Sequence, residues 1–277
     1  MQLRVRHTTG YRYAEGAIAS FNEARMTPLS SDRQIVLRSR IDVTPTPWST
    51  EYRDYWGTVV TAFEVHEPHD ELLVVATSTV QTNAVPAVEQ RLGWDALDAV
   101  SDRYVEFLSL SDWVAPGADL LDALAGERER AATPGDYAHA VCDFVNDQLA
   151  YVEGATEVTS TAADAWAARS GVCQDFAHVT LGALRSAGIP ARYVSGYLHP
   201  QPDAVIGEEV AGESHAWIEW WDGDWVGFDP TNDRPADAHH VIVARGRDYD
   251  DVPPLRGIYS TRGASELFVS VDVTRLA

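Results

Sequence analysis

Apolar and polar positions over the first eighty residues follow the two-residue period of β-strands. β-Branched and aromatic residues alternate or cluster over residues 3–5, 35–41, 59–65 and 72–80, with turns rich in proline and aspartate between these runs. Several short strands at this spacing favour a sandwich-like arrangement. We therefore expect a β-rich N-terminal module over residues 1–82.

From about Trp94 the apolar period becomes helical. Thr133 and Pro134 suit the cap and the first turn of a helix. The apolar face of that helix is formed by Ala138, Val141, Cys142, Val145 and Leu149. Because Cys142 lies within this stripe, we interpret it as a buried, inert thiol.

A second helix is predicted to begin close to Cys173, and Gly188 and Pro190 end its apolar pattern. Strand-like runs follow at residues 191–198, 214–221 and 224–229, and the tail around 266–273 predicts one further strand. We therefore expect an α+β protein in which residues 83–245 hold a helical segment and the main core. Residues 246–277 are expected to form a C-terminal extension with a final strand. One option is that this strand returns to the N-terminal module.

Cys173 differs from Cys142 in its position. A Ser-Gly-Val break at residues 170–172 places the Cys173 thiol at the first turn of the second helix. There the unpaired backbone N–H groups and the positive end of the helix dipole favour a thiolate. The N–H groups of Cys173 and Gln174 are also candidates for an oxyanion hole. A purely structural role for a cysteine at a helix start stays open.

A candidate base lies in the hairpin that follows. His215 begins one strand-like run and Asp229 ends the next, and residues 221–223 (Trp-Asp-Gly) suit a three-residue loop that ends on a left-handed glycine. That loop would pair Trp220 with Asp224 and place His215 directly opposite Asp229. A two-residue loop would instead put the two side chains on opposite faces of the sheet.

The predicted register indicates a catalytic triad of Cys173, His215 and Asp229. Asp229 would accept a hydrogen bond from one ring nitrogen of His215, and the other nitrogen would face Cys173 and activate it. Taken singly, His215 is also compatible with a core histidine, and Asp229 with a turn residue before Pro230.

Composition narrows the possible partners and location. The formal net charge is −21, and a surface this acidic repels nucleic acid and anionic membranes. All 21 basic side chains are arginine, so the chain has no lysine amine of its own to accept an acyl group. Two cysteines, no apolar leader and no membrane-spanning run favour a cytoplasmic protein, with no indication of its oligomeric state.

Several motifs resemble those of one family. GVCQDFAH surrounds Cys173, SHAW contains His215 and DPTN begins at Asp229. The N-terminal sequences YRY at 11–13, NEAR at 22–25 and DYWGTVV at 54–60, and GRDYDDVPPLRG at 246–257, extend the likeness over nearly the whole chain. Together they resemble the bacterial members of the transglutaminase-like superfamily.

The resemblance implies a papain-related core, with the cysteine helix packed on an antiparallel sheet that carries the histidine and aspartate. It also implies acyl transfer through a thioester on peptide or glutamine-type amide bonds, as a cysteine protease or amidase or as an acyltransferase. Gln174 stands where animal transglutaminases have tryptophan, and no calcium-binding loop is present. A catalytically silent peptide-binding or scaffold protein that retains the fold is the alternative.

Other candidates are weaker. Trp217 and Tyr249 are proposed to line the substrate cleft, Tyr249 on the resemblance alone. His178 lies about 140° around the helix from Cys173 and should point away from it, towards solvent or behind the site. His239 and His240 lack the ligand spacing of a metal site, so we expect no metal or cofactor, and a peptide or protein as substrate.

Overall fold

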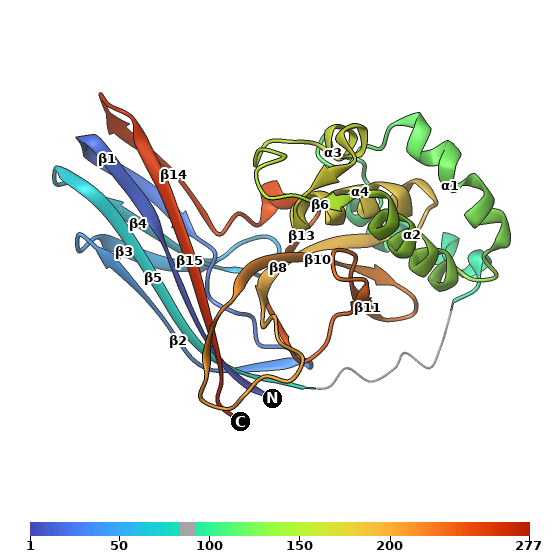
Figure 1. Cartoon of the computed structure of the whole chain (residues 1–277), viewed down its shortest axis with the longest axis horizontal. Helices are drawn as coiled ribbons and strands as arrows, with labels where there is room; N and C mark the ends of the chain where they lie inside the picture. Colours follow the sequence, from blue (N-terminus) through green and yellow to red (C-terminus); the bar gives the residue numbers. More distant parts are fainter. Residues whose placement is uncertain (84–91) are drawn as a thin grey trace.

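The structure, a computed structural model, describes residues 1–83 and 92–277. A large antiparallel sheet forms one half of the molecule, and helices stacked on a smaller antiparallel sheet form the other (Figure 1). The predicted α+β fold, with a β-rich N-terminal part and a helix-on-sheet core, is therefore confirmed. Residues 84–91, near the start of the predicted segment 83–245, lie outside the described residues.

The large sheet has eight strands. They are β1 (Gln2–Ala24), β2 (Gln34–Thr44), β3 (Trp48–Arg53), β4 (Val59–Val65), β5 (His69–Thr82), β9 (Glu209–Ala211), β14 (Leu255–Thr261) and β15 (Ser265–Arg275). The first half of β1 pairs with β5 and β15, and its second half pairs with β4 and β14. The predicted sandwich-like module therefore takes the form of one continuous sheet that curls along its longest strand.

The chain ends in the sheet where it began. β15 pairs with β1 from Leu3 to Tyr13, and the Gln2 N–H donates to the carbonyl of Ala277 at 2.8 Å. Both termini consequently lie side by side at the lower edge of the sheet (Figure 1). The C-terminal strands thus lie in the same sheet as the N-terminal ones.

The second sheet carries the hairpin with the candidate base. Its strands, in spatial order, are β12 (Arg234–Pro235), β11 (Trp225–Asp229), β10 (Glu213–Trp221), β8 (Ala191–Leu198) and β13 (His240–Gly246). A short parallel pair, β6 (Ala150–Tyr151) and β7 (Ser170–Gly171), precedes the cysteine helix. The three predicted runs after that helix correspond to β8, β10 and β11.

Helices cover one side of the second sheet (Figure 1). They are α1 (Ala118–Arg130), α2 (Pro134–Gln148), α3 (Ala162–Ala168) and α4 (Cys173–Ser186), with short 3-10 helices η1 (Trp94–Ala96), η2 (Asp98–Val100), η3 (Asp102–Phe107) and η4 (Tyr249–Asp251). The hydroxyl of Thr133 caps α2 as predicted, and Gly188, with φ of 81°, follows the end of α4. No helix among the described residues has the length and apolarity needed to cross a membrane.

The predicted hairpin register is wrong by two residues. Trp221 pairs with Trp225, and Trp220 with Val226, so the loop is 222–224 with Gly223 in its middle. Trp221 stays in the strand because its ring packs against Trp225, and the buried Asp222 is held by the N–H of Leu92 at 2.7 Å. A shift of two preserves the faces of both strands, so the carboxylate at the end of β11 remains on the histidine's side.

Candidate active site

Cys173 is the first residue of α4, and its side chain is partly exposed. The N–H groups of Asp175 and Phe176 both reach the carbonyl of Val172, at 2.8 and 3.2 Å. Helix geometry leaves the N–H groups of Cys173 and Gln174 without an intrahelical partner. These two donors, next to the thiol, are the ones that an oxyanion would use.

Asp175 fixes the start of α4 and was not predicted as a site residue. Its Oδ2 atom accepts the N–H of Val172 at 2.7 Å and the hydroxyl of Thr156 at 2.6 Å. The side chain is buried, and burial raises its pKa. An acidic residue three positions after a helix cap is the sequence signal that indicates this role.

The side chain of Gln174 also holds the loop before α3. Its Nε2 atom donates to the carbonyl of Val158 at 3.0 Å. With the Thr156–Asp175 bond, this contact ties residues 156–158 to the two positions that follow the nucleophile. The Gln174 amide is therefore engaged with the loop, which leaves its backbone N–H as the oxyanion candidate.

His215 and Asp229 are in direct contact. Nε2 of His215 lies 2.7 Å from Oδ2 of Asp229, and both side chains are buried. Asp229 is held further by the N–H groups of Thr231 and Asn232 on Oδ1, at 3.0 and 3.2 Å, and by the Asn232 amide on Oδ2. The turn that follows β11 thus orients the carboxylate towards the imidazole.

A second histidine, His240, contacts the same carboxylate. Its Nε2 atom lies 3.3 Å from Oδ2 of Asp229, and its Nδ1 accepts the N–H of Asp237 at 3.1 Å. The same Nδ1 atom also lies 3.2 Å from Oδ1 of Asp237, so the His240 ring stands between two carboxylates. From the sequence, His240 was weighed only as a metal ligand, and its contact with Asp229 was not predicted.

The nitrogen and oxygen atoms of His215, Asp229 and His240 lie within 4.8 Å of one another, which is close enough for a metal ion. Both rings instead have hydrogen-bonding distances to one oxygen of Asp229. A metal ion would require each ring to release the proton that makes its bond. The arrangement fits two imidazole donors that share one carboxylate.

The pKa values of His215 and Asp229 are shifted in opposite directions. Burial would lower the pKa of His215, but hydrogen bonds with Asp229 and Cys173 and the charges of both groups raise it to about 10. Burial would likewise raise the pKa of Asp229, but hydrogen bonds from His215 and His240 hold it well below its usual range. The site therefore favours an imidazolium beside a carboxylate.

Cys173 is a second neighbour of the imidazole. A polar contact with its side chain contributes to the raised pKa of His215. The buried Nδ1 atom of His215 meets no described residue in regular hydrogen-bond geometry, so the thiol contact is looser than the 2.7 Å bond to Asp229. The structure thus places Cys173, His215 and Asp229 close to one another, and their catalytic roles stay a prediction.

The prediction that Trp217 lines the cleft is wrong. The Trp217 side chain is 1% exposed and packs in a small core with Val194, Ala236 and Ile242. Its ring stacks near His215 and meets the His240 ring edge-on, with ring centres 5.1 Å apart in the second pair. Trp217 is buried because neighbouring strands and the segment at Leu29 cover its side of the sheet. Its ring therefore packs against the two imidazoles and does not line a cleft.

Tyr249 lies behind the cysteine helix. Its N–H donates to Nε2 of His178 at 3.2 Å, and its ring packs near Trp113. His178 is fully buried, so the solvent-facing option for it is wrong, and it serves to fix the segment with Tyr249.

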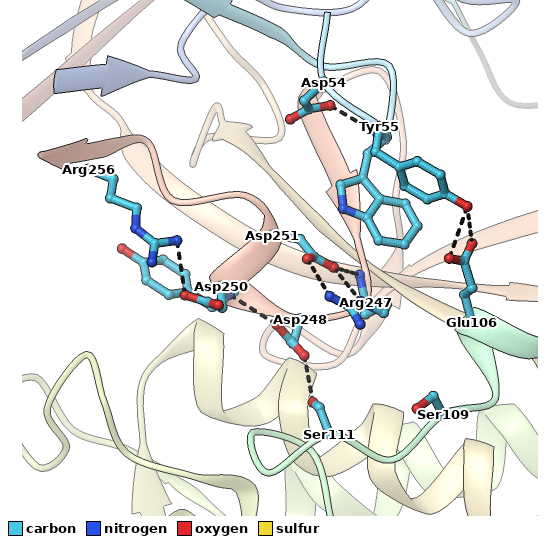
Figure 2. Close-up of polar contacts among 12 residues, drawn as sticks. Asp54, Tyr55, Glu106, Ser109, Ser111, Arg247, Asp248, Asp250, Asp251 and Arg256 are labelled. Atoms are coloured by element: carbon cyan, nitrogen blue, oxygen red, sulfur yellow. Dashed lines mark hydrogen bonds and ion pairs between the residues drawn. The ribbon is translucent and has the colours of Figure 1, made fainter. Parts of the chain in front are cut away.

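The segment with Tyr249 joins three parts of the chain. Figure 2 shows Arg247 paired with Asp251, and Asp248 accepting the hydroxyl of Ser111 at 2.5 Å. Tyr55 of the N-terminal module donates to Glu106 in the same region (Figure 2). The Arg247 guanidinium also lies over the Trp56 ring, 5.5 Å from its centre, so the GRDYDD motif contacts both halves of the molecule.

Tyr151 lies near Cys173 and was not predicted from the sequence as a candidate site residue. Its side chain is 47% exposed at the end of β6. Burial of the hydroxyl, followed by the charges of Cys173 and Glu213, raises its pKa to about 12. An exposed aromatic side chain within electrostatic reach of the thiol suits one edge of a substrate cleft, although no spacing in the sequence indicates it.

The chain is similar to two protein-family models and to several full-length bacterial proteins. Residues 3–81 match the bacterial transglutaminase-like N-terminal region, and residues 122–230 match the transglutaminase-like superfamily core. A protein of Mycobacterium leprae, itself uncharacterized, is 47% identical over 100% of this chain and 99% of its own length. An uncharacterized protein of Mycobacterium tuberculosis is 33% identical over 98% of this chain and 91% of its own.

More distant likenesses involve proteins with assigned activities. A Pseudomonas aeruginosa protein named protein-glutamine gamma-glutamyltransferase is 39% identical over 69 residues, which are 23% of this chain and 10% of that protein. A crystal structure from Cytophaga hutchinsonii, provisionally described as a cysteine protease, matches with a TM-score of 0.78 at 23% identity, over 100% of this chain and 91% of that one. On the two family matches and the full-length relatives, this chain belongs to the transglutaminase-like superfamily.

Proposed function

We propose that the protein is a thiol-dependent enzyme that cleaves or transfers amide bonds through an acyl-enzyme on Cys173. The observation that carries the proposal is the position of His215, whose buried ring contacts both the carboxylate of Asp229 and the side chain of Cys173. An imidazole oriented on one side by a carboxylate and facing a thiol on the other is the arrangement that nucleophilic thiol catalysis requires.

The proposed reaction begins with attack of the Cys173 sulfur on an amide carbonyl carbon. The carbonyl oxygen gains the negative charge of the tetrahedral intermediate, and the N–H groups of Cys173 and Gln174 are placed to stabilise it. His215, as imidazolium, then gives its proton to the departing nitrogen, the C–N bond breaks and a thioester remains. Asp229 keeps the ring oriented and stabilises its cationic form.

The second half of the reaction decides the class of enzyme. Water that attacks the thioester gives a carboxylic acid, the product of a protease or amidase. A primary amine gives a new amide, the product of an acyltransferase. In either case His215 takes the proton of the nucleophile, and the Cys173 thiolate leaves and is regenerated.

Peptide bonds and glutamine side chains are the substrates we propose. The likeness to a protein-glutamine gamma-glutamyltransferase covers only 69 residues, yet it supports glutamine amides as one class. Because the chain has no lysine, an amine acceptor has to come from another molecule, such as a lysine side chain of a partner protein.

The test is a product analysis with a library of glutamine-containing peptides, with and without a primary amine. We expect ammonia release or shorter peptides without the amine, and a peptide–amine adduct if transfer is preferred. Cys173→Ala should abolish every product, whereas Cys142→Ala, a substitution at the buried cysteine, should retain them. Absence of any Cys173-dependent product across the library would favour the alternative of a catalytically silent binding protein.

A further inference from the structure

A trough on the N-terminal sheet is lined by arginine and threonine side chains. It has a volume of about 380 Å³, and its lining residues are Arg4, Arg38, Arg40, Asp42, Thr77 and Thr79. They come from three adjacent strands, β1, β5 and β2. None of these residues belongs to the catalytic half of the molecule.

Strand register explains why these side chains converge. Thr79 of β5 pairs with Arg4 on one side and with Arg38 on the other. Thr77 pairs with Arg40 one step further along the sheet. Directly paired residues project from the same face, so the two threonines lie between flanking arginines.

This face of the sheet points away from its core. The neighbours of Arg4 along β1, Leu3 and Val5, are buried in the core that the sheet shares with the catalytic half. Arg4, Arg38 and Arg40 are exposed, since side chains alternate between the two faces of a strand. The guanidinium groups therefore face an open trough.

Two of the three arginines are not neutralised. Arg40 is paired with Asp42, the single carboxylate in the trough. Arg4 and Arg38 form no ion pair with any described residue. The hydroxyls of Thr77 and Thr79 make no hydrogen bond with residues 1–83 or 92–277. An unpaired cluster of positive charge is unexpected in a chain whose formal net charge is −21.

The available donors match a compact anion. Guanidinium groups bind phosphate and carboxylate oxygens through pairs of parallel hydrogen bonds, and hydroxyls add single donors beside them. Several converging cations suit a group with two or more negative charges better than a single carboxylate. The strong negative charge of the remaining surface disfavours an extended polyanion, which would run beyond the trough.

We propose that this trough binds a compact ligand carrying a phosphate monoester or diphosphate group. The two uncompensated arginines, Arg4 and Arg38, supply the main charge–charge contacts on either side of Thr79. The site is separate from the proposed catalysis, so a Cys173→Ala variant should bind the ligand as the unaltered chain does.

Inorganic pyrophosphate is the probe, and titration calorimetry at fixed ionic strength is the measurement. We expect saturable binding that Arg38→Gln weakens about tenfold, equivalent to about 1.4 kcal/mol, because the substitution removes one charged donor to the anion. Arg262→Gln is the matched control. Arg262 is exposed on the turn between β14 and β15, so its substitution removes the same charge at a position outside the trough. It should leave the affinity unchanged.

Parallel arms distinguish other sources of negative charge. Vesicles containing phosphatidic acid, a DNA oligonucleotide and a glutamate-rich peptide are each tested against the same variants. The proposal is overturned if pyrophosphate does not saturate, if Arg38→Gln and Arg262→Gln weaken it equally, or if only one of the larger anions binds in an Arg38-dependent way. Unchanged thermal unfolding of both variants excludes loss of fold as the cause.

Discussion

Nε2 of His240 lies 3.3 Å from the Oδ2 atom of Asp229, on the oxygen that also receives the His215 ring. The carboxylate is therefore bonded from two sides by imidazoles of different strands. The Nδ1 atom of His240 lies near both the backbone N–H and the carboxylate of Asp237, which hold the ring in place. We infer that His240 keeps Asp229 ionised and oriented for its contact with His215.

Replacing His240 tests that positioning role. In His240→Leu the donor to Asp229 is lost, whereas His240→Gln keeps an N–H donor of similar reach. A lost hydrogen bond to a charged group costs about 1.5–3 kcal/mol, so kcat/KM should fall roughly tenfold or more in the leucine variant. The glutamine variant should recover most of that loss. Equal losses in both variants would mean that the ring serves only to pack against Trp217.

The raised pKa of His215 predicts a pH dependence of stability. Its folded-state pKa is about 10, against an ordinary value of 6.5, so the folded chain holds an additional proton between these pH values. The resulting stabilisation, on the order of a few kcal/mol, is complete below pH 6.5 and is lost as the pH rises towards 10.

Denaturant unfolding at several pH values across that window measures the effect. In His215→Gln the group that titrates is gone, so the free energy of unfolding should change less between pH 6.5 and 10 than in the unaltered chain. Parallel pH curves for the two proteins would contradict the assignment of the proton to His215.

The two cysteines should differ in reactivity in the folded state. Cys142 is fully buried, and burial raises its pKa well above the ordinary value, whereas Cys173 is partly exposed at a helix start. We expect iodoacetamide to modify Cys173 alone at pH 7, as measured by peptide mass mapping. Denaturant should then expose Cys142 to the same reagent. Equal labelling of both thiols before unfolding would show that Cys142 is not in the core.

The loop before α3 should depend on its bond to Asp175. Thr156→Val removes the hydroxyl that donates to the buried carboxylate, which should loosen residues 156–158 and raise KM more than it lowers kcat. Faster amide hydrogen exchange in this loop is the direct measurement. Thr159→Val is the control, because Thr159 is exposed in the same loop. An unchanged exchange rate in Thr156→Val would show that the bond to Asp175 does not hold residues 156–158 in place.

Local patterns were enough to predict much of the fold. The helix from Pro134 and the helix from Cys173 have apolar faces and end signals that depend only on nearby residues. The contact between His215 and Asp229 was also predictable, because an error of two in the hairpin register leaves both residues on one face. The register itself depended on tertiary contacts of Asp222 with Leu92, which no turn rule contains.

The errors share a physical cause. Trp217 is buried because segments distant in sequence cover its side of the sheet, including the chain around Leu29. His240 reaches Asp229 from β13, which lies beyond β8 in the sheet order, and nothing in the local pattern brings these strands together. Long-range packing of this kind decides which residues surround a site, whereas local pattern decides which elements carry them.

The proposed activation of Cys173 by His215 can be tested without a substrate, through the rate of Cys173 alkylation. Iodoacetamide reacts with thiolate, so the second-order rate at pH 7 reports how strongly the imidazolium favours that form. We predict that His215→Gln, verified as folded, lowers the rate by roughly tenfold or more relative to the unaltered chain. An equal or higher alkylation rate in His215→Gln would mean that His215 does not activate Cys173.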